Sequence, residues 1–231
     1  MSDDLFCNSS DKRTHNSTHD NASDPCVVIL YCDNDIIVVD KQADVLSVPG
    51  RGPEKLDSIT HRLTLKFEEI HIVHRLDMAT SGIMVFARTK DALRSLQQQF
   101  QNRQTKKRYQ AIVAGLLTPS SGAVNLPMRC DWPNRPRQMV CYEYGKKSLT
   151  RWRVIDYVNG NTRVELLPVT GRSHQLRIHC DAMNHPILGD HLYGTEDSQN
   201  ASKQLCLHAQ TLTFTHPSTL TEVTFSSPVP F

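Results

Sequence analysis

The sequence predicts an α+β domain built on a largely antiparallel sheet. Three observations support this class. Short runs of β-branched and aromatic residues recur along the chain, and turn-forming residues separate them. Only three segments have the three- and four-residue apolar spacing of an amphipathic helix. Strands and helices do not alternate regularly, as they would in a parallel α/β sheet.

The first 25 residues are rich in Ser, Asn, Asp and His and contain almost no aliphatic side chains. Such a segment cannot bury enough apolar surface to offset the entropy lost on ordering. We therefore expect residues 1–25 to be a disordered polar tail and residues 26–231 to form the folded domain. The first two strands are expected at 27–31 and 36–39, on either side of a turn at 33–35.

Two helices and a buried strand are predicted next. Between residues 55 and 70 an apolar residue recurs every three or four positions, which indicates an amphipathic helix. The residues with this spacing are Leu56, Ile59, Leu63, Phe67 and Ile70. A loop at 74–82 and a buried strand at 83–87 follow. Thr89 can then cap a second helix, whose inner face consists of Leu93, Leu96 and Phe100.

Strands dominate the remainder of the chain. One is expected at 109–114, after a basic connector at 103–108 and before Gly115. Four later runs, at 150–157, 163–167, 211–214 and 222–225, have the pattern of antiparallel strands. A short helix is expected at 173–184, with Leu176, Cys180 and Met183 on one face, and Asn184 closes it before Pro186.

Length and composition exclude several classes of protein. A chain of 231 residues suits one large domain or two small ones, and its 39% hydrophobic and 22% charged residues are ordinary for a folded protein. No window approaches the roughly 18 uninterrupted apolar residues of a transmembrane helix, and the chain begins without a signal-peptide pattern. The seven cysteines include no Cys-x-x-Cys pair. We therefore expect a cytoplasmic protein with reduced thiols and no membrane contact.

The net charge of +2 conceals an uneven distribution. Residues 1–45 hold nine acidic and three basic side chains, so the rest of the chain holds 23 basic against 15 acidic ones, a net +8. A basic body suggests a polyanionic partner such as nucleic acid. A modest surplus of lysine and arginine is nevertheless more often simply a solvated surface.

Asp77 is the first candidate for catalysis. It ends the stretch His-Arg-Leu-Asp at 74–77 and precedes turn-forming residues at 80–82, so its carboxylate lies at the entrance to a buried strand. Loops held by rigid elements often carry catalytic groups. An aspartate beside an arginine is still more commonly a structural ion pair or a turn former. Taken alone, the position favours the structural role.

A second cluster, at 170–179, contains two arginines and two histidines where a strand gives way to a helix. Backbone N–H groups at a helix start, together with Arg172 and Arg177, can bind a phosphate. A capped helix with a basic polar face is an equally good interpretation. His174 and His179 lack the four-residue spacing of a helical zinc site, so no metal site is predicted. The chain also lacks a hydrolase nucleophile elbow and a glycine-rich nucleotide loop.

Basic and planar residues alternate in the loop at 130–138, which contains Trp132 and Arg135, and again at 106–109. Aromatic rings and guanidinium groups stack on unpaired bases, while lysines contact phosphates. This pattern favours an RNA-binding loop. The alternative for 130–138 is a proline-stiffened surface loop with one buried tryptophan.

Four blocks of the sequence together resemble the RluA family of RNA pseudouridine synthases. They are His-Arg-Leu-Asp-Met-Ala-Thr-Ser-Gly at 74–82, Lys-Arg-Tyr-Gln-Ala at 107–111, the cluster at 170–179, and His-Pro-Ile-Leu-Gly-Asp at 185–190. Their order and spacing match the family pattern, and the similarity runs from about residue 27 to residue 231. The loop Trp-Pro-Asn-Arg-Pro at 132–136 narrows the likeness to the small bacterial dual-specificity members.

The resemblance implies that the chain isomerises uridine in RNA, without a metal or an organic cofactor. It assigns Asp77 as the nucleophile and Tyr109 as the ring that packs on the target base. Arg177 corresponds to the basic residue that pairs with the catalytic carboxylate, and Arg75 to the side chain that fills the vacated stack. The other expected RNA-binding residues are Arg172, His174, Trp132 and Arg135. Whether Asp77 attacks ribose carbon 1 or removes a ribose proton to give a glycal stays open.

The resemblance also implies a mixed, mainly antiparallel sheet with flanking helices and loops. Many relatives carry an S4-type RNA-binding domain upstream, whereas only about 25 polar residues precede this core. We therefore expect a monomer that binds RNA without that module. The expected substrates are a uridine in a tRNA anticodon stem-loop and another in a 23S rRNA stem-loop. The alternatives are the same chemistry on rRNA only or on other RNAs, and a non-catalytic RNA-binding protein.

Overall fold

The computed structural model describes residues 27–231, so the tail expected at 1–25 lies outside the described residues. The described chain forms a ten-stranded sheet with the main path β1–β2–β4–β11–β5–β10–β9–β6, to which β3 adds beside β4 and β12 beside β11. All pairs in this sheet are antiparallel except β4 and β11, which run parallel. The mixed, mainly antiparallel sheet of the predicted α+β class is confirmed.

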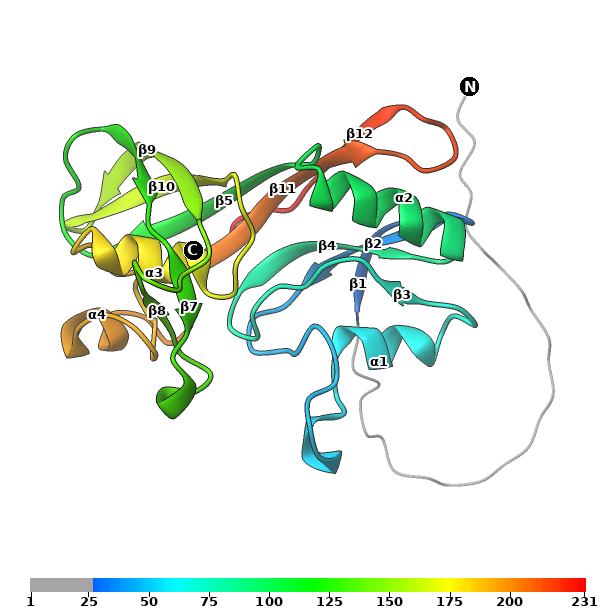
Figure 1. Cartoon of the computed structure of the whole chain (residues 1–231), viewed down its shortest axis with the longest axis horizontal. Helices are drawn as coiled ribbons and strands as arrows, with labels where there is room; N and C mark the ends of the chain where they lie inside the picture. The colour runs from blue at the N-terminus through cyan, green and yellow to red at the C-terminus, as the bar shows by residue number, and fades with distance from the viewer. Residues whose placement is uncertain (1–26) are drawn as a thin grey trace.

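The first half of the sheet is packed between two helices (Figure 1). Its strands are β1 (Val28–Cys32), β2 (Ile36–Lys41), β3 (His71–Ile72) and β4 (Ser81–Ala87). Helix α1 (Ile59–Thr64) covers one face and α2 (Lys90–Gln101) covers the other. Successive side chains of β4 point to opposite faces, and every residue of β4 is buried because both faces are covered. The predicted cap is confirmed, since the Thr89 hydroxyl accepts from the Ala92 N–H at 3.1 Å.

The single helix predicted between residues 55 and 70 is wrong. The structure has a 3-10 turn, η1 (Pro53–Lys55), and then the short helix α1, which begins where the Ser58 hydroxyl accepts from the His61 N–H. Leu56 and Leu65 are exposed, while Ile59, Leu63, Phe67 and Ile70 pack on one core cluster. Phe67 and Ile70 reach that cluster from the non-helical segment that leads into β3. The apolar spacing fits a helix, but the end of this segment is extended because β3 pairs with β4.

The second half of the sheet contains the strands predicted after residue 100, together with β6. Its strands are β5 (Lys106–Val113), β6 (Ser121–Asn125), β9 (Leu149–Val158), β10 (Asn161–Pro168), β11 (Leu207–Thr215) and β12 (Glu222–Ser226). Strand β11 pairs with β4 on one side and β5 on the other, and so joins the two halves. The predicted helix near 173–184 is α3 (Gln175–Ala182), which packs on this half through Leu176 and Cys180.

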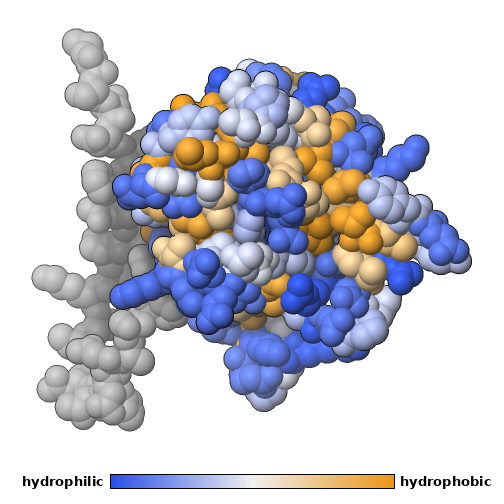
Figure 2. Space-filling model, turned by 90° about the vertical axis from the view of Figure 1, so that its left-hand side faces the viewer, coloured by the Kyte–Doolittle hydropathy of each residue, from blue (hydrophilic) through white to orange (hydrophobic). Residues whose placement is uncertain are grey.

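Several short elements were not predicted, because a few residues give no measurable periodicity. They include the hairpin β7 (Met128–Cys130) and β8 (Gln138–Val140), the turn η2 (Trp132–Asn134) at its tip, and α4 (Glu196–Asn200). On the face of the second half seen in Figure 2, hydrophobic residues lie in patches that hydrophilic residues interrupt. Within residues 27–231, no helix combines the length and apolar character needed to cross a membrane.

Candidate active site

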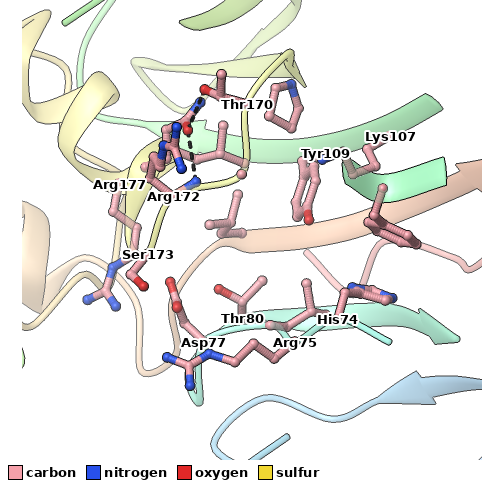
Figure 3. A pocket seen from close by; sticks show the side chains of 17 residues that line it. His74, Arg75, Asp77, Thr80, Lys107, Tyr109, Thr170, Arg172, Ser173 and Arg177 are labelled. Atoms are coloured by element: carbon pink, nitrogen blue, oxygen red, sulfur yellow. Dashed lines mark hydrogen bonds between the residues drawn. The ribbon is translucent and has the colours of Figure 1, made fainter. Parts of the chain in front are cut away.

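A cavity of about 310 Å³ lies where the two halves of the sheet meet. Three segments supply most of its wall: the loop 74–80 before β4, the start of β5, and the loop 168–177 that leads into α3 (Figure 3). Five of the predicted site residues line it, namely Arg75, Asp77, Tyr109, Arg172 and Arg177. Among its described lining residues, Asp77 is the only one with a carboxylate.

The loop that carries Asp77 is held on both sides of that residue. The Ser47 hydroxyl donates to the carbonyl of Leu76 at 2.6 Å and accepts from the N–H of Leu76 at 3.1 Å. On the other side, the buried Lys41 ammonium donates to the carbonyl of Met78 at 2.8 Å. The backbone direction at Asp77 is therefore fixed before any substrate binds. The sequence analysis missed both Ser47 and Lys41, because no spacing rule links positions so far apart in the chain.

His174 faces Asp77 and does not point toward solvent. The Tyr193 hydroxyl accepts from the N–H of Gln138 at 2.8 Å and is hydrogen-bonded to His174 Nδ1, also at 2.8 Å. His174 Nε2 lies 4.0 Å from Asp77 Oδ1. Burial lowers the pKa of His174, although the Asp77 charge acts in the opposite direction. The Tyr193 bond therefore holds the imidazole with Nε2 toward the carboxylate.

Arg177 lines the cavity, but its hydrogen bonds differ from the expectation. Its guanidinium donates two hydrogen bonds to the Asp190 carboxylate, at 2.8 Å and 2.5 Å, and both side chains are buried. Burial disfavours the charged guanidinium, but the Asp190 hydrogen bonds outweigh this and raise the pKa of Arg177. The predicted direct pairing with Asp77 is therefore not seen. Arg177 makes no hydrogen bond to Asp77 within residues 27–231 and acts on it through its charge, because the bidentate contact directs the Nε and Nη2 side of the guanidinium to Asp190.

Tyr109 and His74 are uncharged members of the cavity wall (Figure 3). Burial, and then the charge of Asp77, raise the pKa of Tyr109, so its phenol stays protonated. Burial lowers the pKa of His74 to about 3. Its Nε2 accepts from the N–H of Val85 at 3.1 Å, and its ring stacks on Phe100 with centroids 4.7 Å apart.

Arg75 and Arg172 lie at the edge of the cavity, and both are exposed. Arg75 extends alongside Asp77 (Figure 3), and within residues 27–231 its guanidinium has no hydrogen bond or ion pair. Arg172 has one long contact, from Nε to the Lys147 carbonyl at 3.5 Å. Both side chains are thus free to take an RNA contact without breaking a strong one.

Trp132 and Arg135 lie on the hairpin tip, outside the lining of the cavity. Trp132 is 66% exposed, which contradicts the alternative of a buried tryptophan in this loop. The Arg135 guanidinium lies 4.6 Å from the centre of the indole ring. This exposed stack of a cation on a ring is the kind of surface on which an unpaired base can stack.

The sequence left two interpretations of the cluster at 170–179, a phosphate site and a capped helix with a basic polar face. No side chain caps the start of α3, and phosphate binding by Arg172 stays a prediction. Gln175, at the first position of α3, is buried and uses its full hydrogen-bonding capacity. Its carbonyl oxygen accepts from the hydroxyl of Thr170 and the N–H of Arg172, at 2.8 Å and 3.0 Å. Its amide donates to the Leu149 carbonyl and the Thr150 hydroxyl, at 3.1 Å and 3.0 Å. The polar inner face is structural, whereas Arg172 at its edge remains available to substrate.

One group of potential metal ligands exists among the described residues, outside this cavity. It consists of Asp33, Asp35 and His216, whose ligand atoms lie within 4.8 Å of one another. The Asp33 carboxylate already accepts from the N–H groups of Asp35 and Ile36 and contacts His216 Nε2, each at 2.8 Å. These bonds fasten the β1–β2 turn to the chain after β11, which accounts for the cluster.

Comparisons with known proteins agree with this geometry. The family model described as RNA pseudouridylate synthase matches residues 35–182. The dual-specificity RNA pseudouridine synthase RluA of Escherichia coli (strain K12) is 50% identical over 209 residues, which cover 90% of this chain and 95% of that protein. The protein of the same name from Haemophilus influenzae is 51% identical over 205 residues, covering 88% and 94%. The structure of human RNA Pseudouridylate Synthase Domain Containing 1 superposes with a TM-score of 0.77 at 28% identity, covering 92% of this chain and 87% of the human one. The chain belongs to the RNA pseudouridylate synthase family.

Proposed function

We propose that Asp77 is the catalytic carboxylate with which this enzyme isomerises uridine to pseudouridine in RNA. The observation that carries the assignment is that Asp77 is the single carboxylate among the described residues that line the cavity, which also include cationic side chains and the partly buried ring of Tyr109. In the isomerisation the bond from ribose carbon 1 to N1 of the base breaks, and a bond to carbon 5 forms. The hydrogen lost from carbon 5 is balanced by the one gained at N1.

The cavity suits the charge requirements of this reaction. The isomerisation needs a carboxylate that can act as a nucleophile or a base. Arg177 is bonded to Asp190, and His174 Nε2 lies 4.0 Å from Asp77, so the Asp77 oxygens are open to the ribose. Tyr109, held neutral, offers a ring face on which the uracil can stack.

The target uridine must flip out of the base stack of its stem-loop before it can enter the cavity, at a cost of a few kcal/mol. Arg75 is positioned to offset that cost, because it is exposed, lies beside Asp77 and has no ion pair among residues 27–231. Its planar guanidinium can occupy the gap left in the base stack. Trp132 and Arg135, on the β7–β8 hairpin, would contact nucleotides of the RNA stem-loop that lie farther from the reacting base.

We assign two substrate classes to the enzyme: a tRNA anticodon stem-loop and a 23S rRNA stem-loop. The support is the likeness to relatives described as dual-specificity RNA pseudouridine synthases, which extends over 90% of the chain. We further propose that the enzyme acts in the cytoplasm as a monomer, with no metal or organic cofactor. Product from only one of the two RNAs would restrict the substrate assignment and leave the chemistry intact.

Replacement of Asp77 tests the catalytic assignment. In Asp77→Asn the carboxylate becomes a neutral amide of equal size, so we expect pseudouridine formation to fall by at least about a thousandfold while stem-loop binding changes by less than about threefold. Asp91→Asn, on the exposed side of α2, is the matched control and should retain full activity. Single-turnover assays with both stem-loops, read by pseudouridine mapping, provide the measurement.

The same assay separates the competing functions. If the wild-type protein binds both stem-loops but modifies neither, it is an RNA-binding protein without this activity. If Asp77→Asn retains near-wild-type turnover, the catalytic role belongs to another residue.

A further inference from the structure

A second cavity, of about 770 Å³, adjoins the one around Asp77. It lies between the C-terminal end of α2, the start of β5 and the loop after β10. The described residues of its wall include five cationic side chains and no acidic one. We call this second cavity the basic trough. Its cationic side chains are Arg103, Lys106, Lys107, Arg151 and Arg172. Lys107 and Arg172 line both cavities, so the trough continues directly from the proposed active site.

Most of these charges have no acidic partner among residues 27–231; the exception is Lys106, which pairs with Glu222. Lys107 is half-buried, yet within residues 27–231 its ammonium makes no hydrogen bond or ion pair. Its nearest specific contact is the ring of Phe100, whose centre lies 5.9 Å from Nζ, and burial lowers the pKa of Lys107. Arg103 and Arg151 also have no acidic partner among the described residues. Partial burial of a cation without an acidic partner is costly, so the position of Lys107 favours an anion supplied from outside. The other four cations of the trough are exposed and can reach the same anion.

The backbone at Arg103 provides a second, independent observation. The end of α2 is a Schellman motif, in which Gln104 N–H bonds the Gln99 carbonyl at 2.9 Å and Arg103 N–H bonds the Phe100 carbonyl at 3.3 Å. Arg103 occupies the left-handed position of that motif, with φ 58°. Glycine suits this position, and a side chain there is strained. An arginine at the mouth of a basic cavity, in a conformation that disfavours it, indicates that its charge is needed.

We propose that the basic trough binds the phosphates of the RNA strand that adjoins the target uridine. The proposal rests on the function proposed above. Lys107 and Arg172, shared by the two cavities, contact the phosphate next to the flipped nucleotide, and Arg103 and Arg151 contact the phosphates that follow. Guanidinium and ammonium groups both bind phosphate oxygens strongly and without sequence preference. The trough therefore sets the direction of the strand through the site.

Neutral linkages in the RNA identify the contacted phosphates. Stem-loops that carry one methylphosphonate linkage at a time, on either side of the target uridine, are bound to the wild-type enzyme. We expect one or two adjacent linkages, all on one side, to weaken binding about five- to tenfold, because each removes one charge-assisted contact. The Lys107→Gln variant should lose sensitivity to the linkage nearest the uridine.

Two variants test the outer cations. Arg151→Gln and Arg103→Gly should each raise KM about five- to tenfold with little change in kcat, and lower the dependence of log Kd on log salt by about 0.7. Arg103→Gly should also raise the melting temperature, since it relieves the strained position. A purely structural Arg103 would not combine higher stability with weaker binding. Arg94→Gln, an exposed arginine of α2 that pairs with Asp91, is the control that changes neither quantity.

The outcomes distinguish this proposal from the function on which it rests. If the wild-type enzyme forms no pseudouridine, the proposed function fails. Suppose instead that the wild-type enzyme forms pseudouridine, but Lys107→Gln keeps its sensitivity to every methylphosphonate linkage. If Arg151→Gln and Arg103→Gly also keep the wild-type KM and salt dependence, the phosphate site is overturned. Sensitive linkages on both sides of the uridine would also overturn the one-sided path.

Discussion

The ammonium group of Lys41 is fully buried, and its three protons go to the carbonyl oxygens of Gln42, Val45 and Met78, each at 2.8 Å. Burial lowers the pKa of Lys41 to about 8, so the group is still charged at neutral pH. The three bonds tie the end of β2 to the residue after Asp77. A buried side chain that does not line the cavity around Asp77 thus helps to fix the backbone of the proposed catalytic loop.

We expect Lys41→Met to lower the free energy of unfolding by about 3 kcal/mol, because three carbonyl oxygens lose their donor and each such loss costs about 1–3 kcal/mol. Urea denaturation measures this change. Lys90→Met, at an exposed position of α2, should shift stability by less than about 0.5 kcal/mol. Equal effects of the two substitutions would show that the buried hydrogen bonds contribute little.

His179 accounts for part of the pH dependence of stability. Its Nε2 and Nδ1 contact the hydroxyls of Ser148 and Thr150, at 3.0 Å and 2.8 Å, and burial lowers its pKa to about 4. Between this value and the ordinary pKa of about 6.5, the unfolded chain takes up a proton that the folded chain does not. The contribution of His179 to the free energy of unfolding is therefore fully present above pH 6.5 and is lost as the pH falls toward 4. The depressed pKa of His74 acts in the same direction.

We expect the free energy of unfolding to fall on going from about pH 7 to about pH 4.5, with up to about 3 kcal/mol of the loss due to His179. His179→Asn should be less stable at neutral pH but lose less on acidification. His191→Asn, at an exposed position, should keep the wild-type pH dependence. Denaturant titrations at both pH values measure these free energies. Equal losses of unfolding free energy on acidification in wild type and His179→Asn would refute the assignment to His179.

At the scale of elements, the parallel contact between β4 and β11 joins the two halves of the sheet. Gly82 lies at this contact, opposite Ala209, with φ 111°. A Cβ atom placed on Gly82 would lie 2.4 Å from the carbonyl oxygen of Ala209, which belongs to rigid backbone. The glycine that follows the Asp77 loop is thus required for β11 to approach β4.

We predict that Gly82→Ala destabilises the protein by about 3 kcal/mol or more, because strain at positive φ adds to a backbone clash. Gly160→Ala is the matched control: its φ is 76°, but nothing lies within 4 Å of its added Cβ. The control should cost only about 1 kcal/mol. Thermal denaturation of both variants separates the clash from the conformational strain, and similar losses would contradict the close approach.

At the scale of the whole molecule, the proposed active site lies between two halves, each with its own hydrophobic core. The first half supplies Asp77 and Arg75, and the second supplies Tyr109 and the 168–177 loop. Among residues 27–231, every residue that lines this cavity lies at or after His74, and every one that lines the adjoining trough lies at or after Val73. Residues 27–72 therefore line neither cavity.

Removal of residues 1–25 should leave kcat and KM for both stem-loops within about twofold of the full chain, since no described lining residue precedes Val73. Steady-state assays on the full and shortened chains test this, with melting temperature as the folding control. A large rise in KM for the shortened chain, at unchanged melting temperature, would assign an RNA contact to the tail.

The sequence determined the fold class, most of the strands and the candidate carboxylate. Continuous β-branched runs and the Thr89 cap are local signals, so 83–87, 109–114 and α2 could be placed without tertiary information. Asp77 was identified through the four motif blocks, since its local context favoured a structural role. Periodicity was misleading between residues 55 and 70, where both a helix and extended chain put apolar residues on one core.

Only the tertiary structure decided which groups meet. Arg177 was expected to pair with Asp77, but the fold brings Asp190 to its guanidinium and leaves His174 facing Asp77. Lys41 and the basic trough were invisible in sequence for the same reason. Hydrogen bonds and charge pairs act over a few ångströms between residues that can be far apart in the chain, whereas sequence patterns report mainly on neighbours.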